Sequence, residues 1–407
     1  MSGLAMWSSA AQPQTKAVRP QGRADLRAAK RSACRRQEAP KKNCTFEKKE
    51  SKMDIDLYFS KQLRQWFEQR EGRYLPWKEG QDPYKIWLAE IIMQQTRLEQ
   101  GLPYYERFIA AYPSIKELAE TEEQKLMKLW QGLGYYARAR NLQATAKRIV
   151  AEYGGVFPDN YKAILDLKGV GEYTAAAIAS FAYDLPYAVV DGNVYRVLSR
   201  YFGQALPIDS SAGKKWFKAK AQALLWEDDP ANYNQAMMDF GALHCRPKNP
   251  SCGDCPLAKN CQAKANKQQL ELPKKGKKLK IKKRYFYYFI WQSPSGAYYL
   301  RKRQEKDIWQ GLYEFPMIEL DKPLKTSELK TLWAHWELEE QDWALISGQE
   351  QQQLSHQKII ARFLWPKQPL AQALAADWEL VDAQSWPNYP LPRLIAQYWE
   401  KKQLAFF

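Results

Sequence analysis

The chain has 407 residues, 45% of them hydrophobic, and carries a formal net charge of +17. This length favours two domains with additional segments, and the hydrophobic content is enough for sizeable cores. The sequence has no apolar run of about 18 residues and no apolar stretch at its start, so we expect neither a membrane-spanning helix nor a secretory signal peptide.

The positive charge is concentrated in two segments. Residues 1–52 contain 13 Lys and Arg against 4 Asp and Glu, and residues 264–284 contain 10 against one, so the rest of the chain is nearly neutral. Basic flexible segments attract polyanions such as nucleic acids without reading their sequence. A solubilising linker is the alternative interpretation of either segment.

Residues 1–52 have little apolar periodicity, and we interpret them as a basic, disordered N-terminal extension. Cys34 and Cys44 lie in it. An organelle transit peptide is one alternative. Another is that Met53 is the true start, because helical patterning begins directly after it.

Residues 53–262 predict an all-α domain. Asp82 and Pro83 form a typical helix N-cap and first helical residue. In the helix that follows, Glu90 is the one carboxylate within an apolar run. Burial raises the pKa of a carboxyl group, which makes it a proton donor at neutral pH. The alternative is a glutamate at the helix edge that pairs with a lysine.

A second carboxylate follows a glycine turn. Gly169-Val170-Gly171 precedes a helix-forming run, and the N–H groups of such a turn can bind a phosphate. Asp191 stands twenty residues after Gly171. It would lie beside the sugar of the bound strand, or it would simply cap a helix. Cleavage at an anomeric carbon uses two carboxylates: one protonates the leaving group and the other stabilises the cationic sugar.

Four cysteines, Cys245, Cys252, Cys255 and Cys261, lie within 17 residues. That density of thiols indicates a metal site, either iron–sulfur or zinc. Their uneven spacing resembles the [4Fe–4S] loop of the endonuclease III superfamily of DNA glycosylases. We interpret the neighbouring His244 as a packed or exposed side chain rather than a ligand.

Beyond a basic connector at 263–284 the pattern changes, and residues 285–407 predict an α+β domain. Residues 285–291 and 297–300 predict strands around a Ser-Pro-Ser-Gly turn, and 358–365 predict another strand by their alternation. A helical pattern closes the chain near 392–404.

Several motifs occur in one order along the chain. They begin at Glu90 (Glu-Ile-Ile-Met-Gln-Gln-Thr), Gly132 (Gly-Leu-Gly-Tyr-Tyr-Ala-Arg), Gly169 (Gly-Val-Gly-Glu-Tyr-Thr), Val190 (Val-Asp-Gly-Asn-Val) and Cys245 (the cysteine loop). With these motifs the chain resembles adenine DNA glycosylases of the MutY type, closely over 53–262 and more weakly beyond. The resemblance implies a helix–hairpin–helix domain with a [4Fe–4S] cluster.

The resemblance also implies roles for individual residues. Glu90 is expected to protonate adenine, Asp191 to stabilise the sugar cation or its covalent intermediate, and Tyr173 and Asn193 to support them. The residues expected to contact DNA are Gln95, Thr96, Leu133, Tyr135, Gly169 and Gly171. Gln95 and Tyr135 are expected to enter the base stack as adenine leaves it, a step that needs unstacking energy.

The adenine pocket implied by the resemblance consists of Trp77, Lys78 and Asp239. Lys78 stands where the family has an arginine, and Asp239 stands where a glutamate is frequent, so the contacts to the adenine edge depart from the family pattern. Lys168 replaces a frequent proline and could add a phosphate contact.

Residues 298–303 and 309–316 resemble the Nudix-like domain of the same family. The array of metal-binding glutamates that marks Nudix hydrolases is absent from the sequence, so we expect binding without pyrophosphatase activity. Leu354-Ser355-His356 matches the Phe-Ser-His element of the family, which implies that Ser355 and His356 read 8-oxoguanine.

The sequence therefore predicts a base excision repair enzyme that removes adenine opposite 8-oxoguanine or guanine in double-stranded DNA. Related bifunctional lyases carry a Schiff-base lysine where this chain has Tyr173, so we expect a monofunctional glycosylase. A bifunctional lyase and a non-catalytic lesion-binding protein are the alternatives. We further expect a monomer without membrane association, cytoplasmic and nucleoid-associated if the source is bacterial.

Overall fold

The computed structural model describes residues 52–70, 73–276, 280–329, 331–332, 343–367, 378–382 and 384–404. The predictions for residues 1–51, including disorder and the two N-terminal cysteines, lie outside these ranges. Within them, no helix is long and apolar enough to cross a membrane.

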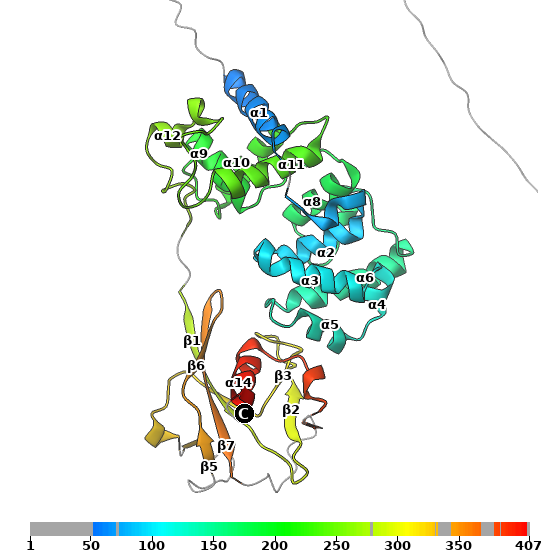
Figure 1. The fold of residues 1–407 in the computed structure, drawn as a ribbon, viewed down its shortest axis with the longest axis vertical. Coiled ribbons are helices and arrows are strands. Elements are labelled where there is room, and N and C mark those ends of the chain that lie inside the picture. The colour runs from blue at the N-terminus through cyan, green and yellow to red at the C-terminus, as the bar shows by residue number, and fades with distance from the viewer. Residues whose placement is uncertain are drawn as a thin grey trace, which may run out of the picture. The chain divides into compact units, whose positions relative to one another are not determined.

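The N-terminal half is helical, as expected (Figure 1), and its described residues up to 276 contain no strand. Its α-helices are α1 (Lys52–Glu68), α2 (Pro83–Met93), α3 (Leu98–Ala111), α4 (Ile115–Glu120), α5 (Glu123–Trp130), α6 (Ala137–Tyr153), α7 (Tyr161–Leu165), α8 (Glu172–Tyr183), α9 (Gly192–Phe202), α10 (Ser211–Ala223), α11 (Pro230–Asp239) and α12 (Gln262–Ala265). A short 3-10 helix at Pro76–Gln81 precedes α2, and a π-helical turn at Phe240–His244 follows α11.

Local sequence explains where the key helices begin and end. The Asp82 side chain accepts the backbone N–H groups of Tyr84 and Lys85, and Pro83 is the first residue of α2, which confirms the predicted cap. Helix α6 ends at Gly154, whose φ of 62° is the left-handed conformation that glycine adopts without steric cost.

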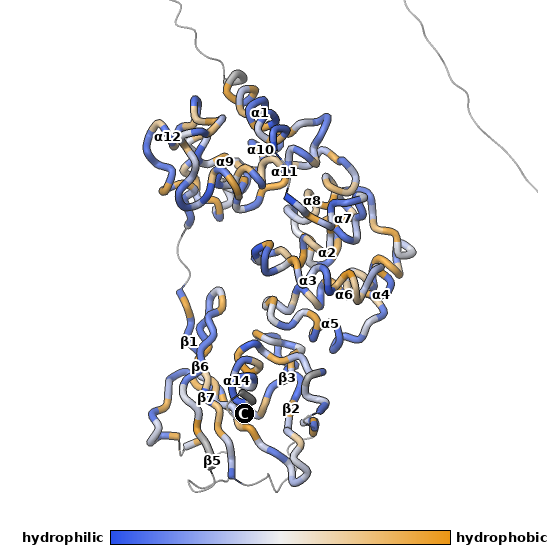
Figure 2. Tube along the Cα trace, viewed as in Figure 1, coloured by the Kyte–Doolittle hydropathy of each residue, from blue (hydrophilic) through white to orange (hydrophobic). Residues whose placement is uncertain are grey.

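Two apolar cores hold the helices together. Helices α2 to α8 contribute fully buried residues such as Leu88 and Ile178 to the first, and α2 and α8 carry hydrophobic colours along much of their length in Figure 2. Helices α1, α9, α10 and α11 form the second around residues such as Leu198 and Phe217. Glu90 thus lies on a helix of the first core, whereas Asp191 precedes a helix of the second.

The C-terminal half contains two sheets and a closing helix, α14 (Arg393–Leu404). Its strands are β1 (Lys282–Phe289), β2 (Tyr298–Lys302), β3 (Tyr313–Glu314), β4 (Met317–Leu320), β5 (Trp343–Ile346), β6 (Glu350–Gln353), β7 (Gln357–Pro366) and β8 (Glu379–Val381). One sheet has the order β4-β1-β7-β5 with β6 also paired to β7, and the other has the order β3-β2-β8. Strands β1 and β7 run parallel, with Lys282 opposite Gln357. The predicted strands and helix are confirmed with small shifts at their ends.

Strand β1 corrects two expectations about the connector. It begins at Lys282, inside the range 263–284 that the sequence assigned to the connector. Arg284, which we included in the basic connector, is buried, and its guanidinium binds Asp307 and Glu319 with N–O distances of 2.6–3.0 Å. Its charge is therefore neutralised within the C-terminal domain.

Gly213 in α10 supplies a stability prediction for the second core. A Cβ at this position would overlap the carbonyl oxygen of Pro207. We expect Gly213→Ala to lower the free energy of unfolding by about 1–3 kcal/mol through overpacking, although alanine is normally the better helix former. Ala219→Gly, at an exposed position of the same helix, should cost only about 1 kcal/mol. Denaturant unfolding measures both, and a stabilised Gly213→Ala protein would contradict the packing.

Candidate active site

The Glu90 carboxyl lies on α2 among fully buried apolar neighbours, and the residue is 9% exposed. Burial raises its pKa above the ordinary value, and the charge of Asp191 raises it further. The charge of Lys78 and a hydrogen bond from Tyr173 act in the opposite direction. The net result is a carboxyl group that keeps its proton to higher pH than a free glutamate, as the sequence predicted.

Asp191 is the N-cap of α9. Its Oδ1 accepts the backbone N–H groups of Asn193 and Val194, each at 2.8 Å, and its Oδ2 accepts the Asn193 side-chain amide at 2.7 Å. The capping alternative is thus structurally correct, and it does not conflict with chemistry. Burial raises the pKa of Asp191, but these donors and the helix dipole favour the charged form.

Asn193 joins Asp191 to the chain that follows α11. The side-chain Oδ1 of Asn193 accepts a hydrogen bond from Arg196 at 2.8 Å. Arg196 also donates to the backbone carbonyls of Gly241 and Cys245, at 2.6 and 2.7 Å. A Cβ on Gly241 would approach Asn193 to 2.6 Å, so only glycine permits this packing. Sequence reasoning missed Arg196, whose only sequence signal is its position one helical turn after Gly192.

Tyr173 is the second residue of α8, and its hydroxyl group has one proton to donate. Met238 Sδ lies 3.9 Å away and the Glu90 carboxyl is the stronger acceptor. Burial and the two carboxylates raise the pKa of Tyr173 well above its usual value, so the hydroxyl stays protonated. Position 173 therefore offers a hydrogen-bond donor, and it carries no amine that could form a Schiff base.

Gln235 bridges two of the three predicted pocket residues, Lys78 and Asp239. Trp77 is 4% exposed and lies in the core, with its ring 5.3 Å from that of Tyr105. The Lys78 ammonium donates to Gln235 Oε1 and lies 3.2 Å above the centre of the Phe181 ring. Desolvation lowers the pKa of Lys78 to about 7.

Asp239 lies deeper, where Gln235 Nε2 and Arg73 Nε donate to its Oδ1 at 2.6 and 2.7 Å. Arg73 and Gln235 were missed from the sequence. The Arg73 guanidinium pairs with Asp239, and its position two residues before Leu75 was the only signal for it in the sequence.

Two surface turns carry the residues expected to invade the base stack. Gln95 (φ 57°) and Tyr135 (φ 47°) both adopt the left-handed conformation that is rare for residues other than glycine. Both are exposed, Tyr135 by 44%. Thr96 follows at the same surface and is partly buried. Leu133 is 7% exposed and packs in the first core, and it also lines a cavity together with Tyr135.

The glycine turn lies between α7 and α8. Gly169 has a φ of 81°, and a Cβ there would lie 2.9 Å from that of Asn141, so the turn requires glycine. Gly171 is the N-cap of α8 and no side chain caps the helix. The first N–H groups of α8 therefore remain open to an anion such as a phosphate.

Comparisons with known proteins match this arrangement. The helical part fits the HhH-GPD superfamily of base excision DNA repair proteins over residues 88–210, and the C-terminal part fits the NUDIX domain over residues 287–401. The adenine DNA glycosylase of Buchnera aphidicola subsp. Baizongia pistaciae is 36% identical over 261 residues, 64% of this chain and 74% of that protein. The chain belongs to the adenine DNA glycosylase family.

Other relatives agree. The adenine DNA glycosylase of Buchnera aphidicola subsp. Schizaphis graminum is 36% identical over 66% of this chain and 77% of its own length. The human adenine DNA glycosylase is 36% identical over 53% of this chain and 41% of its own. The predicted family, fold class and enzyme class, a DNA N-glycosylase of base excision repair, are confirmed.

The cysteine loop of this glycosylase follows the π-helical turn, and Cys261 leads into α12. All four cysteines are free and half-buried, and Arg200 donates to Cys245 Sγ at 3.3 Å. Burial raises the pKa of the Cys255 thiol to about 12, with smaller contributions from the other three thiols. Among the described residues, no group of three or more His, Cys, Asp or Glu side chains is arranged to hold a metal ion. The donor chemistry nonetheless fits a cluster, since buried thiols become thiolates only beside a cation.

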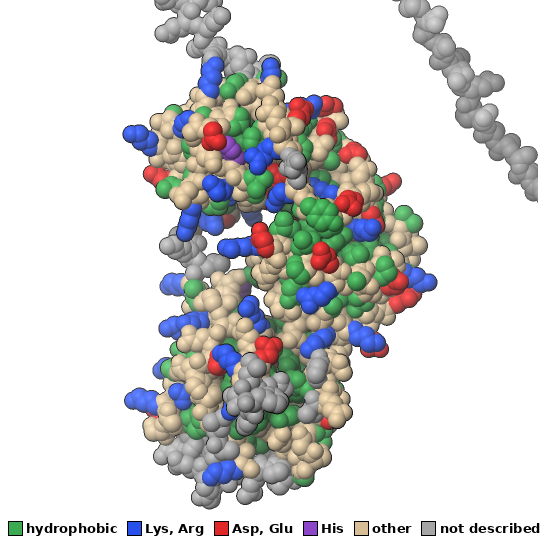
Figure 3. Space-filling model, in the orientation of Figure 1, with side chains coloured by type: hydrophobic (Ala, Val, Ile, Leu, Met, Phe, Trp, Pro, Cys, Tyr) green, Lys and Arg blue, Asp and Glu red, His purple; other side chains and the backbone are tan. Residues whose placement is uncertain are grey.

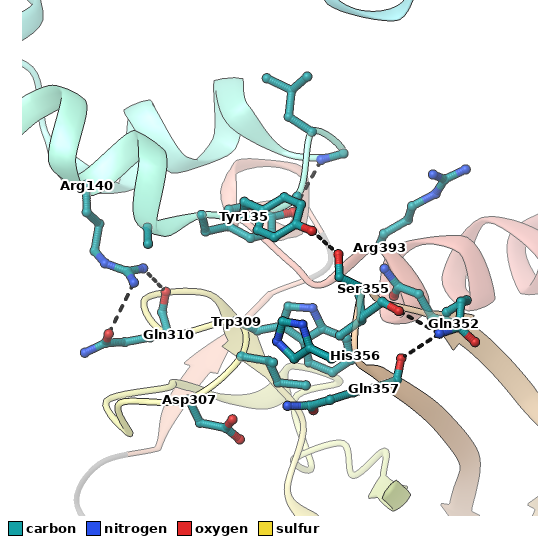
Figure 4. Close-up of a pocket in the computed structure, with 18 of the residues that line it drawn as sticks. Tyr135, Arg140, Asp307, Trp309, Gln310, Gln352, Ser355, His356, Gln357 and Arg393 are labelled. Atoms are coloured by element: carbon teal, nitrogen blue, oxygen red, sulfur yellow. Dashed lines mark hydrogen bonds between the residues drawn. The ribbon is translucent and has the colours of Figure 1, made fainter. Parts of the chain in front are cut away.

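Ser355 and His356 form the exposed turn between β6 and β7. The Ser355 and Tyr135 hydroxyl groups are hydrogen-bonded, as Figure 4 shows. These two residues line a cavity of about 470 Å³. Figure 4 draws its lining, which also includes His356, Trp309 and Arg393. The structure thus brings Tyr135, one of the two predicted stack-invading residues, to the same cavity as the predicted lesion-reading residues Ser355 and His356.

Asn193 and Asn232 provide a matched pair of variants. Asn232 also donates to the aspartate that caps its helix, Asp229, at 2.9 Å, but on an exposed surface. We expect Asn193→Ala to slow adenine release at least about tenfold by removing a donor to a charged group. Asn232→Ala should leave the rate unchanged and cost similar stability. Equal single-turnover rates for the two variants would contradict a supporting role for Asn193.

Proposed function

We propose that this glycosylase hydrolyses the N-glycosidic bond of adenine opposite 8-oxoguanine or guanine in double-stranded DNA and leaves an abasic site. One observation carries the proposal: a buried carboxyl of raised pKa, Glu90, interacts with a second carboxylate, Asp191, that a helix N-terminus holds. This pair suits departure of a protonated base from a sugar that becomes cationic.

In this mechanism Glu90 donates its proton to a ring nitrogen of adenine as the glycosidic bond breaks. General acid catalysis of this kind contributes about 10²–10⁴-fold. Asp191, its two oxygens fixed by three donors, stabilises the positive charge on the sugar until water adds. Tyr173 fixes the Glu90 carboxyl and offers no amine for a Schiff base, which supports a monofunctional reaction.

Ser355 is the residue that we assign to the opposing 8-oxoguanine, because its hydroxyl group can donate or accept at the altered edge of the base. His356 lies beside it, and the contact with Tyr135 supports joint action on one mispair. The enzyme would act as a monomer on the DNA of its cell, in the cytoplasm if the source is bacterial.

We assign a [4Fe–4S] cluster to Cys245, Cys252, Cys255 and Cys261. The cluster would supply the positive charge that four thiolates need and would cross-link the loop. Arg200 would hold the loop through its contact with Cys245, whichever oxidation state the cluster adopts.

The primary test is single-turnover adenine release from a duplex with adenine opposite 8-oxoguanine. Wild-type protein should release adenine rapidly, and Glu90→Gln, which keeps the shape but has no acidic proton, should lose at least about 10²-fold. Borohydride should trap little covalent adduct. No release by cluster-replete wild type would overturn the glycosylase proposal, and efficient trapping would indicate a lyase.

The raised pKa of Glu90 predicts the pH dependence. The active form is protonated, so the rate should stay high beyond the range where a free glutamate ionises and should fall as pH rises through the raised pKa. Lys78→Met removes a charge that lowers this pKa and should move the fall to higher pH. Lys78→Arg, which stays charged, should not. A fall at the pH of an ordinary glutamate would contradict the burial argument.

The connector lysines predict the salt dependence of DNA binding. Lys275, Lys280, Lys282 and Lys283 are exposed, and Figure 3 shows Lys and Arg side chains along the edge where the connector meets β1. Each phosphate contact that is lost should flatten the log–log dependence of affinity on salt by about 0.9. Changing the four lysines to Gln should therefore flatten it by up to ~3.6. Lys116→Gln with Lys125→Gln, on α4 and α5, is the control. An unaltered slope in the quadruple variant would rule out the connector as a phosphate clasp.

A further inference from the structure

Arg138, the second residue of α6, binds the backbone on both sides of the candidate site. One terminal guanidinium nitrogen donates to the carbonyls of Ile91, Ile92 and Gln94 at 2.9, 3.1 and 2.7 Å. The other donates to the carbonyls of Leu133 and Gly134, both at 3.3 Å. One side chain thus joins two turns that lie forty residues apart in the sequence.

Two of these carbonyls, those of Gln94 and Gly134, directly precede the two strained residues. Gln94 is followed by Gln95, and Gly134 is followed by Tyr135, the two left-handed residues at the tips of the turns. A residue other than glycine stays in this conformation only when its surroundings hold it there. Arg138 fixes the peptide unit before each of them.

The same contacts cap the C-terminus of α2, the helix that carries Glu90. The last carbonyls of an α-helix lack partners within the helix, and a cation near them is favourable. Helix α2 has no basic residue in its own last turn, and Arg138 supplies that charge from α6. Arg138 therefore holds both the end of the helix that carries Glu90 and the turn at Gln95.

We propose that Arg138 is a positioning residue that locks the Gln95 turn, the Tyr135 turn and the end of α2 into one arrangement, so that extrusion of the base delivers it to Glu90. The inference rests on the proposed function, which assigns Gln95 and Tyr135 to the base stack. Arg138 itself touches neither the base nor the sugar.

Only a guanidinium fits this position. It offers five donors in a planar fork, whereas a lysine offers three donors from one point and cannot reach both turns. Desolvation lowers the pKa of Arg138 to about 10, which leaves it charged at neutral pH. The Arg138 Cζ atom lies 5.1 Å from the centre of the Trp130 ring. The Trp130 indole N–H donates to the Gly134 carbonyl at 3.0 Å.

The test separates extrusion from chemistry. In the Glu90→Gln background, where cleavage should be slower by at least about 10²-fold, 2-aminopurine replaces the target adenine opposite 8-oxoguanine, and its fluorescence reports unstacking at saturating protein. We expect Arg138→Lys to reduce this signal severalfold and, with Glu90 intact, to reduce single-turnover adenine release about tenfold or more, because charge-assisted hydrogen bonds to one turn are lost. The pH at which release falls should stay unchanged.

Trp130→Phe provides a second variant that keeps an aromatic ring at this core position. It removes the indole donor to Gly134 together with part of a buried ring, and it should shift both readouts in the same direction, by less. The matched control is Arg64→Met, because Arg64 also lies over a tryptophan, Trp226, and pairs with Asp228, far along the chain from either turn. It should change neither readout.

Fluorescence of bound Arg138→Lys and Trp130→Phe equal to that of the parent would overturn the inference, even if release or thermal stability fell. If wild-type protein released no adenine, the proposed function would fail instead. The two failures are therefore distinguishable.

Discussion

Desolvation of the Glu90 carboxyl is the interaction on which the rest of the site depends. Helix α2 is buried on nearly all sides because α3 and α8 pack against it, and this places one carboxyl in an apolar environment. Burial penalises the charged form, so the group holds a proton at the pH at which surface glutamates have lost theirs. The ammonium of Lys78 and the hydroxyl of Tyr173 limit that effect without cancelling it.

Helix α9 gives the second carboxyl group a different set of contacts. Its N-terminus directs two backbone N–H groups at Asp191, and the Asn193 amide donates to it as well. Burial raises the pKa of both carboxyl groups, but at Asp191 three hydrogen-bond donors oppose that effect, whereas at Glu90 the opposition comes from the Lys78 charge and the Tyr173 hydroxyl. The contacts differ because Glu90 lies within a helix and Asp191 caps one.

Four side chains that the sequence did not single out organise the polar part of the site. Arg73 and Gln235 fix Asp239, Arg196 links Asn193 to the backbone near Cys245, and Arg138 links the two strained turns. Three of them are arginines, and two of these donate mainly to backbone carbonyls. Arg138 closes the motif that begins at Gly132, but neither that motif nor hydrophobic periodicity indicates which backbone carbonyls it binds, because every residue has a carbonyl group.

The sequence by itself determined the domain types, the helical caps at Asp82 and the glycine turn at 169–171, because these depend on neighbours a few residues away. It also identified Glu90, Asp191 and the cysteine cluster, since an isolated carboxylate in an apolar run and four dense thiols are visible in one dimension. Tertiary structure decided which side chains point where. Leu133 and Trp77 pack in the first core. Arg284 forms an ion pair with Asp307, and the Lys78 ammonium lies over the Phe181 ring. These outcomes depend on partners that are distant in sequence, and only the packed chain brings such partners into contact.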